Sequence, residues 1–121
     1  EAQQIVLLIG TNNEHLNTDE EILQGLELVI NAIKDRQPNA RVLLLGLLPR
    51  VDKEERMRKL NTGIAALATS KMVDYTDIGG VLLGKDQKID ASLFLDGLHP
   101  NAKGYRKLGK ILKLALHEGA N

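Results

Sequence analysis

The chain has 121 residues and a mass of 13.3 kDa, which limits it to one domain of ordinary size. Sixteen basic and sixteen acidic residues cancel, so no long-range field favours a nucleic acid or an anionic membrane as a partner. Cysteine is absent, which excludes disulfides, thiolate zinc sites and a cysteine nucleophile. No apolar run approaches the roughly 20 residues needed to span a bilayer, and no signal-peptide pattern is present.

Strand and helix patterns alternate along the first half of the chain. Residues 5–9 (IVLLI) predict a short strand that is buried on both faces. Thr18 and Glu21 have the spacing of a capping box, which predicts the start of a helix that ends before Pro38. The inward face of this helix is expected to carry Ile22, Leu26, Val29 and Ile33. Residues 42–48 (VLLLGLL) predict a second buried strand.

The second half continues the alternation after Pro49 ends the second strand. A helix is expected over residues 52–69, a short strand over 72–75 and a last helix over 101–117. Glycines break up the stretch between them, and residues 81–89 are compatible with a two-strand ribbon. The expected inward residues of the two helices are Met57, Leu60, Ile64 and Leu67, then Leu108, Ile111, Leu112 and Ala115.

This order of elements predicts a parallel sheet with helices on both faces. In such sheets ligands bind at the carboxyl ends of the strands. The rule selects residues 10–13 (GTNN) after the first strand and residues 47–50 (LLPR) after the second. A long loop brings a third segment, residues 96–100 (DGLHP), with Asp96 and His99.

Each of these segments also has a plainer interpretation. The two asparagines of residues 10–13 are common turn formers, and Asp96 with Gly97 could simply make a turn before a helix. The basic stripe of the last helix is explained as a solvated face: Lys103, Arg106, Lys107, Lys110 and Lys113. His15 and His117 have no ligand spacing to each other or to His99, so neither a metal nor a cofactor is expected.

Taken together and in order, four segments carry a resemblance. IVLLIGTNN, RQPNARVLLLGLLPR, RKLN and DGLHPNAKGY resemble the SGNH hydrolase family, also called GDSL-type esterases. The likeness is closest to the branch that contains the platelet-activating-factor acetylhydrolase catalytic subunits, and it extends over essentially all 121 residues. It implies a flavodoxin-like three-layer α/β sandwich, here with about three strands in a single partial domain, residues 1–121.

The resemblance also implies roles for individual residues. Gly10 and Asn12 match the family block whose asparagine donates a hydrogen bond to the oxyanion. Asp96 and His99 match the block in which histidine is the general base and aspartate orients its imidazole. Leu98 is then expected near the acyl pocket. The implied reaction is serine acyl transfer on a small acyl or acetyl ester.

The sequence departs from the family in one respect. The family's Gly-Asp-Ser block and its second glycine block are absent from residues 1–121. Only two serines exist: Ser70 falls at a predicted helix end, and Ser92 lies outside any strand-to-loop elbow. We therefore expect a truncated or processed chain whose nucleophile-bearing N-terminal segment is missing.

The missing segment leaves three functional hypotheses open. The chain is an ester hydrolase by lineage, a catalytically dead or engineered fragment, or a non-catalytic binding module. In the family's strand order the missing first strand would adjoin residues 5–9, which leaves an apolar sheet edge. Residues 4–9 are thus expected to pair with a complementing N-terminal segment or with a second copy, which would give one six-stranded sheet. No nucleic-acid or membrane partner is expected.

Overall fold

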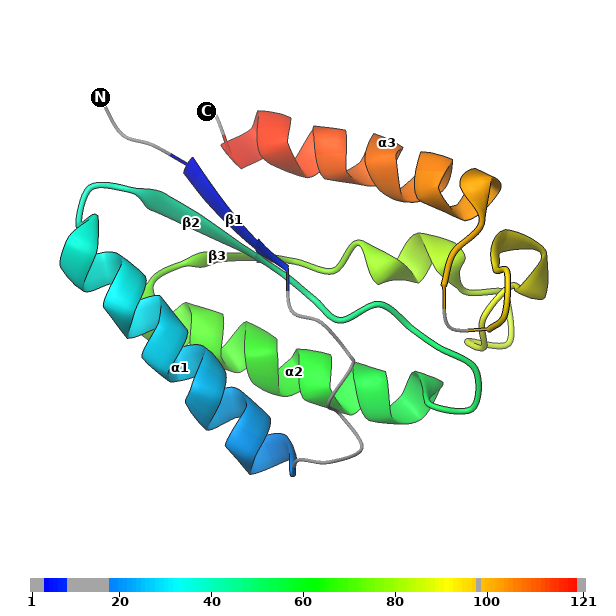
Figure 1. Ribbon diagram of the computed structural model, residues 1–121, viewed down its shortest axis with the longest axis horizontal. Helices are drawn as coiled ribbons and strands as arrows, with labels where there is room; N and C mark the ends of the chain where they lie inside the picture. The colour runs from blue at the N-terminus through cyan, green and yellow to red at the C-terminus, as the bar shows by residue number, and fades with distance from the viewer. Residues whose placement is uncertain (1–3, 9–17, 98, 120–121) are drawn as a thin grey trace.

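The computed structural model describes residues 4–8, 18–97 and 99–119. A parallel sheet in the order β1-β2-β3 forms its middle layer, with α1 and α2 on one face and α3 on the other (Figure 1). The elements are β1 (Gln4–Leu8), α1 (Asp19–Arg36), β2 (Arg41–Leu45), α2 (Glu54–Lys71), β3 (Asp74–Thr76) and α3 (Ala102–Gly119), with two short 3₁₀ helices at Gly79–Leu82 and Ala91–Leu93. The predicted α/β sandwich with a small parallel sheet is confirmed.

The pleat of β2 divides its side chains between two hydrophobic cores. Leu44, paired with Leu7 of β1, belongs to the core under α1 and α2. Leu43 and Leu45 belong to the core under α3. The buried members of the first core are Leu26, Ile30, Leu44, Leu47, Met57, Leu60, Ile64 and Ala68. Those of the second are Leu43, Leu45, Ile78, Leu82, Leu93, Phe94, Leu108 and Ala115.

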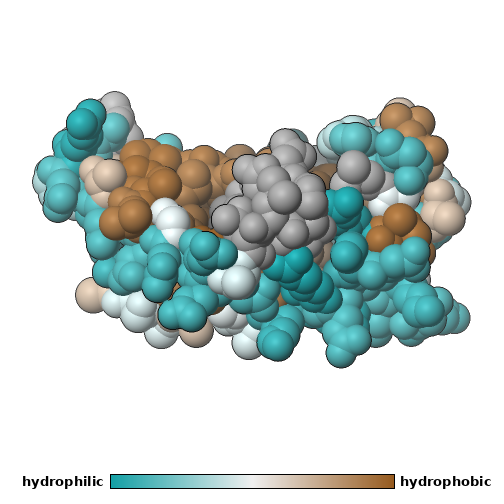
Figure 2. All heavy atoms as spheres, turned by 60° about the horizontal axis from the view of Figure 1, so that its bottom comes forward, coloured by the Kyte–Doolittle hydropathy of each residue, from teal (hydrophilic) through white to brown (hydrophobic). Residues whose placement is uncertain are grey.

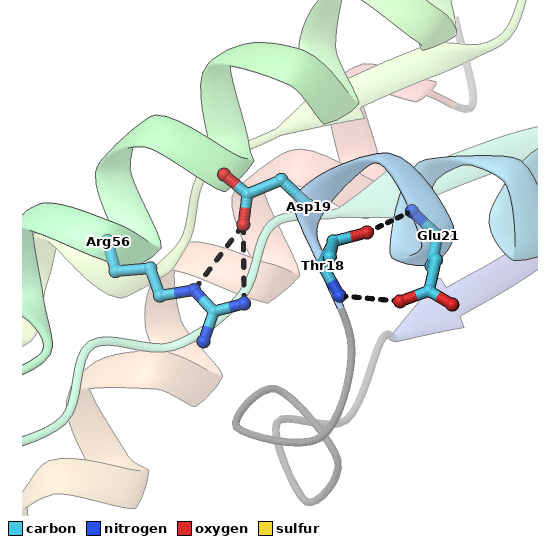
Figure 3. Close-up of polar contacts among 4 residues, drawn as sticks. All are labelled: Thr18, Asp19, Glu21 and Arg56. Atoms are coloured by element: carbon cyan, nitrogen blue, oxygen red, sulfur yellow. Dashed lines mark hydrogen bonds and ion pairs between the residues drawn. The ribbon is translucent and has the colours of Figure 1, made fainter.

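Helix α1 begins with the predicted capping box (Figure 3). The Thr18 hydroxyl accepts from the Glu21 N–H at 3.1 Å, and the Glu21 carboxylate accepts from the Thr18 N–H at 2.9 Å. Next to it, Arg56 of α2 donates to Asp19 at 3.3 Å, so the starts of the two helices are tied together. The capping box thus gives hydrogen-bond acceptors to the Thr18 and Glu21 N–H groups, which have no acceptor within the helix, and this fixes the helix start.

The expected inward face of α1 was wrong at one residue. Val29 is exposed, whereas Ile30 is completely buried in the core. Ile22, Leu26 and Ile30 follow each other at intervals of four residues, and that row faces α2 and the sheet. The sequence offered two adjacent apolar residues, and packing selected the second.

The expected bounds of the second and third strands also shift, and the expected ribbon is reduced. Strand β2 ends at Leu45, not at residue 48, because Leu47 bonds to the Asn61 side chain instead of a neighbouring strand. Strand β3 starts at Asp74 because Met72 is the left-handed C-cap of α2. The ribbon of residues 81–89 reduces to one antiparallel bridge between Leu83 and Ile89.

Figure 2 shows the side on which α1 and α2 come forward. Hydrophilic residues dominate the lower rim of this face, and hydrophobic residues gather toward its upper left. Within the ranges that the structure describes, no helix is both long and apolar enough to cross a bilayer.

Candidate active site

The segment that carries Asp96 and His99 is a narrow turn between two buried residues. Phe94 and Pro100 form an antiparallel bridge at its base. Nearer the tip, the Leu95 N–H donates to the His99 carbonyl at 2.9 Å. The chain reverses at Gly97, whose φ of +80° lies in the region that glycine adopts without strain. The turn is therefore closed by its own backbone, and its tip faces solvent.

Within this turn the Asp96 carboxylate contacts His99 at two atoms. One carboxylate oxygen, Oδ1, accepts the His99 backbone N–H at 2.7 Å. The other, Oδ2, lies 2.9 Å from the imidazole Nδ1. The Asp96 side chain is 54% exposed and that of His99 is 61% exposed, so the pair is open to a ligand that approaches from solvent. The backbone bond fixes the carboxylate, and the carboxylate in turn fixes the ring.

This geometry selects one tautomer of His99. An ionised carboxylate can only accept hydrogen bonds, so Nδ1 must carry the proton. The lone pair of the neutral ring then lies on Nε2, which is the arrangement of a general base held by an orienting carboxylate. The pair can take a proton on Nε2 and stabilise the resulting imidazolium.

Helix α3 anchors the turn from its C-terminal side. The Asn101 side chain caps the helix by accepting the Gly104 N–H at 3.0 Å, and its amide donates to the Ser92 carbonyl at 2.8 Å. Gly104 packs directly on the Leu93 carbonyl, where an added Cβ would lie only 2.4 Å from the oxygen. Asn101 and Gly104 thus hold the start of α3 against the residues that precede the turn.

The loop after β2 anchors the turn from another direction. The Val51 N–H donates to the Gly97 carbonyl at 2.8 Å. The same loop is fixed to α2, because the Asn61 side chain accepts from the Leu47 N–H at 2.7 Å and donates to the Leu47 carbonyl at 3.0 Å. Asn61 therefore completes the hydrogen bonding of a buried residue that has left the sheet.

The sequence-predicted site residues are distributed as follows. Asp96 and His99 lie together in the turn, and their catalytic roles stay predictions. Gly10, Asn12 and Leu98 lie outside the described residues. Among the described residues, no group of three or more histidine, aspartate or glutamate side chains is arranged to hold a metal ion.

Both serine hydroxyls are engaged elsewhere. Ser70 donates to the Leu67 carbonyl at 2.8 Å, as expected for a serine in the last turn of a helix. Ser92 donates to Asp90 at 2.6 Å. The Ser92 hydroxyl, together with the Ser92 N–H, holds the pKa of Asp90 below its usual range. Each hydroxyl thus has a structural partner of its own.

Sequence reasoning missed the residues that support the turn. Val51, Asn61 and Asn101 make the contacts described above, yet none was singled out beforehand. Asn101 had a detectable signal, because asparagine is a preferred residue just before a helix. Asn61 lay in the family-like segment RKLN, but its contact with Leu47, 14 residues away, had no local signal, and neither had the contact of Val51 with Gly97, 46 residues away.

Comparison with known proteins gives the family. The model of the GDSL-like lipase/acylhydrolase family matches residues 1–107. This chain belongs to that family. The rat platelet-activating factor acetylhydrolase IB subunit alpha2 is 37% identical over 113 residues, which cover 89% of this chain and 49% of the relative. The chain thus spans about half the length of the curated relatives it matches.

Solved structures agree with this assignment. A Streptococcus pneumonia structure described as a platelet activating factor superposes with a TM-score of 0.87 at 28% identity, over 94% of this chain and 59% of that one. A GDSL-like lipase from Bacteroides thetaiotaomicron VPI-5482 has a TM-score of 0.81 at 18% identity, over 96% of this chain and 62% of that one. The second likeness shows the shared fold alone.

Proposed function

We propose that this chain carries the acid–base part of the active site of a serine acylhydrolase that acts on small acyl esters such as acetyl esters. The observation that carries the proposal is the 2.9 Å contact between Asp96 and the Nδ1 of His99. Family membership supports hydrolase chemistry in general. We assign Gly10 and Asn12 to the oxyanion site and Leu98 to the acyl pocket on the resemblance alone.

The proposed reaction needs a nucleophile from outside residues 1–121. His99 Nε2 takes the proton of a serine hydroxyl while the serine oxygen bonds to the ester carbonyl carbon. The carbonyl electrons move to oxygen, where the Asn12 amide stabilises the oxyanion. Collapse of this intermediate breaks the ester C–O bond, and His99 returns its proton to the leaving alcohol. Water then repeats the sequence and frees the acid.

The decisive experiment labels the protein as purified with a fluorophosphonate, which reacts with activated serines. Labelling of a serine outside residues 1–121 is the expected result. His99→Ala should abolish it, whereas the matched variant His15→Ala should not. Labelling of Ser70 or Ser92, or labelling that survives His99→Ala, would refute the assignment. A single polypeptide that is neither labelled nor active would identify a catalytically dead fragment.

A second proposal concerns the partner that supplies this segment. Among the described strands, β1 lies at the sheet edge. Its Val6 and Leu8 are 41% and 56% exposed, although their partners in register, Leu43 and Leu45, are only 3% and 2% exposed. Helix α3 thus covers this face of β2 and leaves that of β1 open. We infer that the occupant of the edge brings an apolar helix face as well as a strand.

A second copy meets this requirement less well than a complementing segment. Edge-to-edge pairing of two β1 strands would separate the two β2 strands by three strand spacings, about 14 Å. Helices pack in contact at about 8–10 Å, so the two α3 helices would leave an open groove above Val6 and Leu8. The relatives are about twice as long as this chain, and their additional length is sufficient for a strand and a helix.

A further inference from the structure

The contact between Val51 and Gly97 joins two loops that are far apart in the sequence. Besides the backbone hydrogen bond of 2.8 Å, the Val51 side chain lies over the Gly97 Cα. A Cβ added at Gly97 would lie 2.8 Å from Val51 Cγ1, closer than real Cβ atoms approach other atoms, and 3.0 Å from Val51 Cβ, which is also a tight contact. Position 97 therefore requires glycine for two reasons, its positive φ and this neighbour.

Val51 stands on a segment that the rest of the fold holds in place. At the segment's start, the Gly46 N–H donates to the Thr76 carbonyl of β3 at 3.0 Å. Asn61 then binds Leu47 twice, and buried Pro49 packs so closely on Gly79 that a Cβ there would lie 2.7 Å from its Cδ. Val51 is the residue of this anchored segment that contacts the exposed turn, so the core fixes the position of Gly97 through the segment.

Gly97 lies between the two residues of the proposed catalytic pair. Its conformation determines whether Asp96 can reach both the backbone N–H and the ring of His99, at 2.7 and 2.9 Å. We propose that Val51 and Gly97 are positioning residues for this pair: the loop after β2 holds the turn in the one shape that orients the imidazole. The catalytic consequence rests on the proposed function, whereas the positioning itself can be tested without turnover.

The test is the tautomer of His99, read from long-range ¹H–¹⁵N NMR spectra of the whole chain and assigned with His99→Gln. Asp96→Ala, which removes the hydrogen-bond partner of Nδ1, gives the reference for an unpaired ring. Gly97→Ala should lower the ratio of paired to unpaired ring about 5- to 30-fold, because alanine at positive φ is strained and also meets Val51. Val51→Ala combined with Gly97→Ala should recover part of the Nδ1–H signal by removing the steric conflict.

Gly80→Ala is the matched control, since nothing lies within 4 Å of a Cβ at that position of the 3₁₀ helix Gly79–Leu82. It should leave the His99 tautomer unchanged. A Gly97→Ala protein that is less stable to urea but keeps the wild-type tautomer would overturn the proposal, because the contact would then be merely structural. If the double variant recovers no more of the Nδ1–H signal than Gly97→Ala, Val51 is not a positioning residue.

Failure of the positioning proposal and failure of the proposed function are distinguishable. If Asp96→Ala leaves the tautomer unchanged, the pair does not exist in solution, and the basis of the proposed function is lost. If Gly97→Ala changes the tautomer but His99→Ala leaves fluorophosphonate labelling intact, the loop positions a pair that does not activate a serine.

Discussion

The Asn61 side chain connects α2 with the loop after β2. Its amide satisfies both the N–H and the carbonyl of Leu47, a residue that is only 2% exposed and no longer part of β2. Without it, two buried backbone groups would have no partner. The asparagine therefore takes the place of a neighbouring strand.

Asn61→Ala should lower the free energy of unfolding by about 2–4 kcal/mol, because each unsatisfied buried group costs about 1–3 kcal/mol. Urea denaturation followed by circular dichroism measures this loss. Asn31→Ala, at an exposed position of α1, is the matched control and should change stability by no more than about 0.5 kcal/mol. Equal effects of the two variants would show that the Leu47 contacts contribute nothing.

Tyr75 makes the stability of the fold sensitive to alkaline pH. Burial of its hydroxyl, and next the nearby charge of Asp77, raise its pKa from 10.0 to about 12. Because the folded pKa is the higher one, the stabilisation is fully present below pH 10 and is lost as the pH rises toward 12. Wild-type stability should therefore fall through this window, and Tyr75→Phe should fall less steeply. Urea midpoints measured from pH 9 to 12 give both slopes. Tyr105→Phe, which deletes another tyrosine hydroxyl, is the matched control. Identical slopes for wild type and Tyr75→Phe would refute the role of Tyr75.

Among the elements, α1 depends on its capping box. Thr18→Ala removes the acceptor of the Glu21 N–H and should cost about 1 kcal/mol, by the usual worth of such a cap. Thr62→Ala is the matched control, since Thr62 is exposed on α2 and bonds only to the carbonyl four residues before it. Thermal unfolding of both variants provides the comparison, and an equal change in the two would count against the cap.

At the scale of the whole molecule, the proposed assembly depends on the open face of β1, where Val6 and Leu8 are exposed. Val6→Lys combined with Leu8→Lys should weaken capture of a strand-and-helix segment at least about tenfold, because two charges would enter an apolar interface. Leu28→Lys, on the exposed side of α1, is the matched control and should have no effect.

Native mass spectrometry of the purified protein measures which complexes the wild type and the double variant form. A complex with a segment from outside residues 1–121 that is lost in the double variant supports the inferred occupant. A homodimer lost in the same variant would replace that occupant with a second copy. A monomer of 13.3 kDa at all concentrations would show that the edge has no partner.

The sequence by itself determined the features that depend on neighbours along the chain. The alternation of apolar runs and helical patterns predicted the order of elements and the parallel sheet, and Thr18 with Glu21 marked the start of α1. Asp96 and His99 were predicted as a pair because their segment resembles a block of the family, and their spacing of three residues lets a single turn bring them into contact.

Only the tertiary structure decided the features that depend on distant partners. It chose Ile30 over Val29 for the core and ended β2 at Leu45, because α2 supplied the packing and the Asn61 side chain. It also placed Val51 on Gly97 across 46 residues. Local propensity cannot encode such contacts, since they form only when separately built elements meet, and they are the contacts that hold the proposed site in shape.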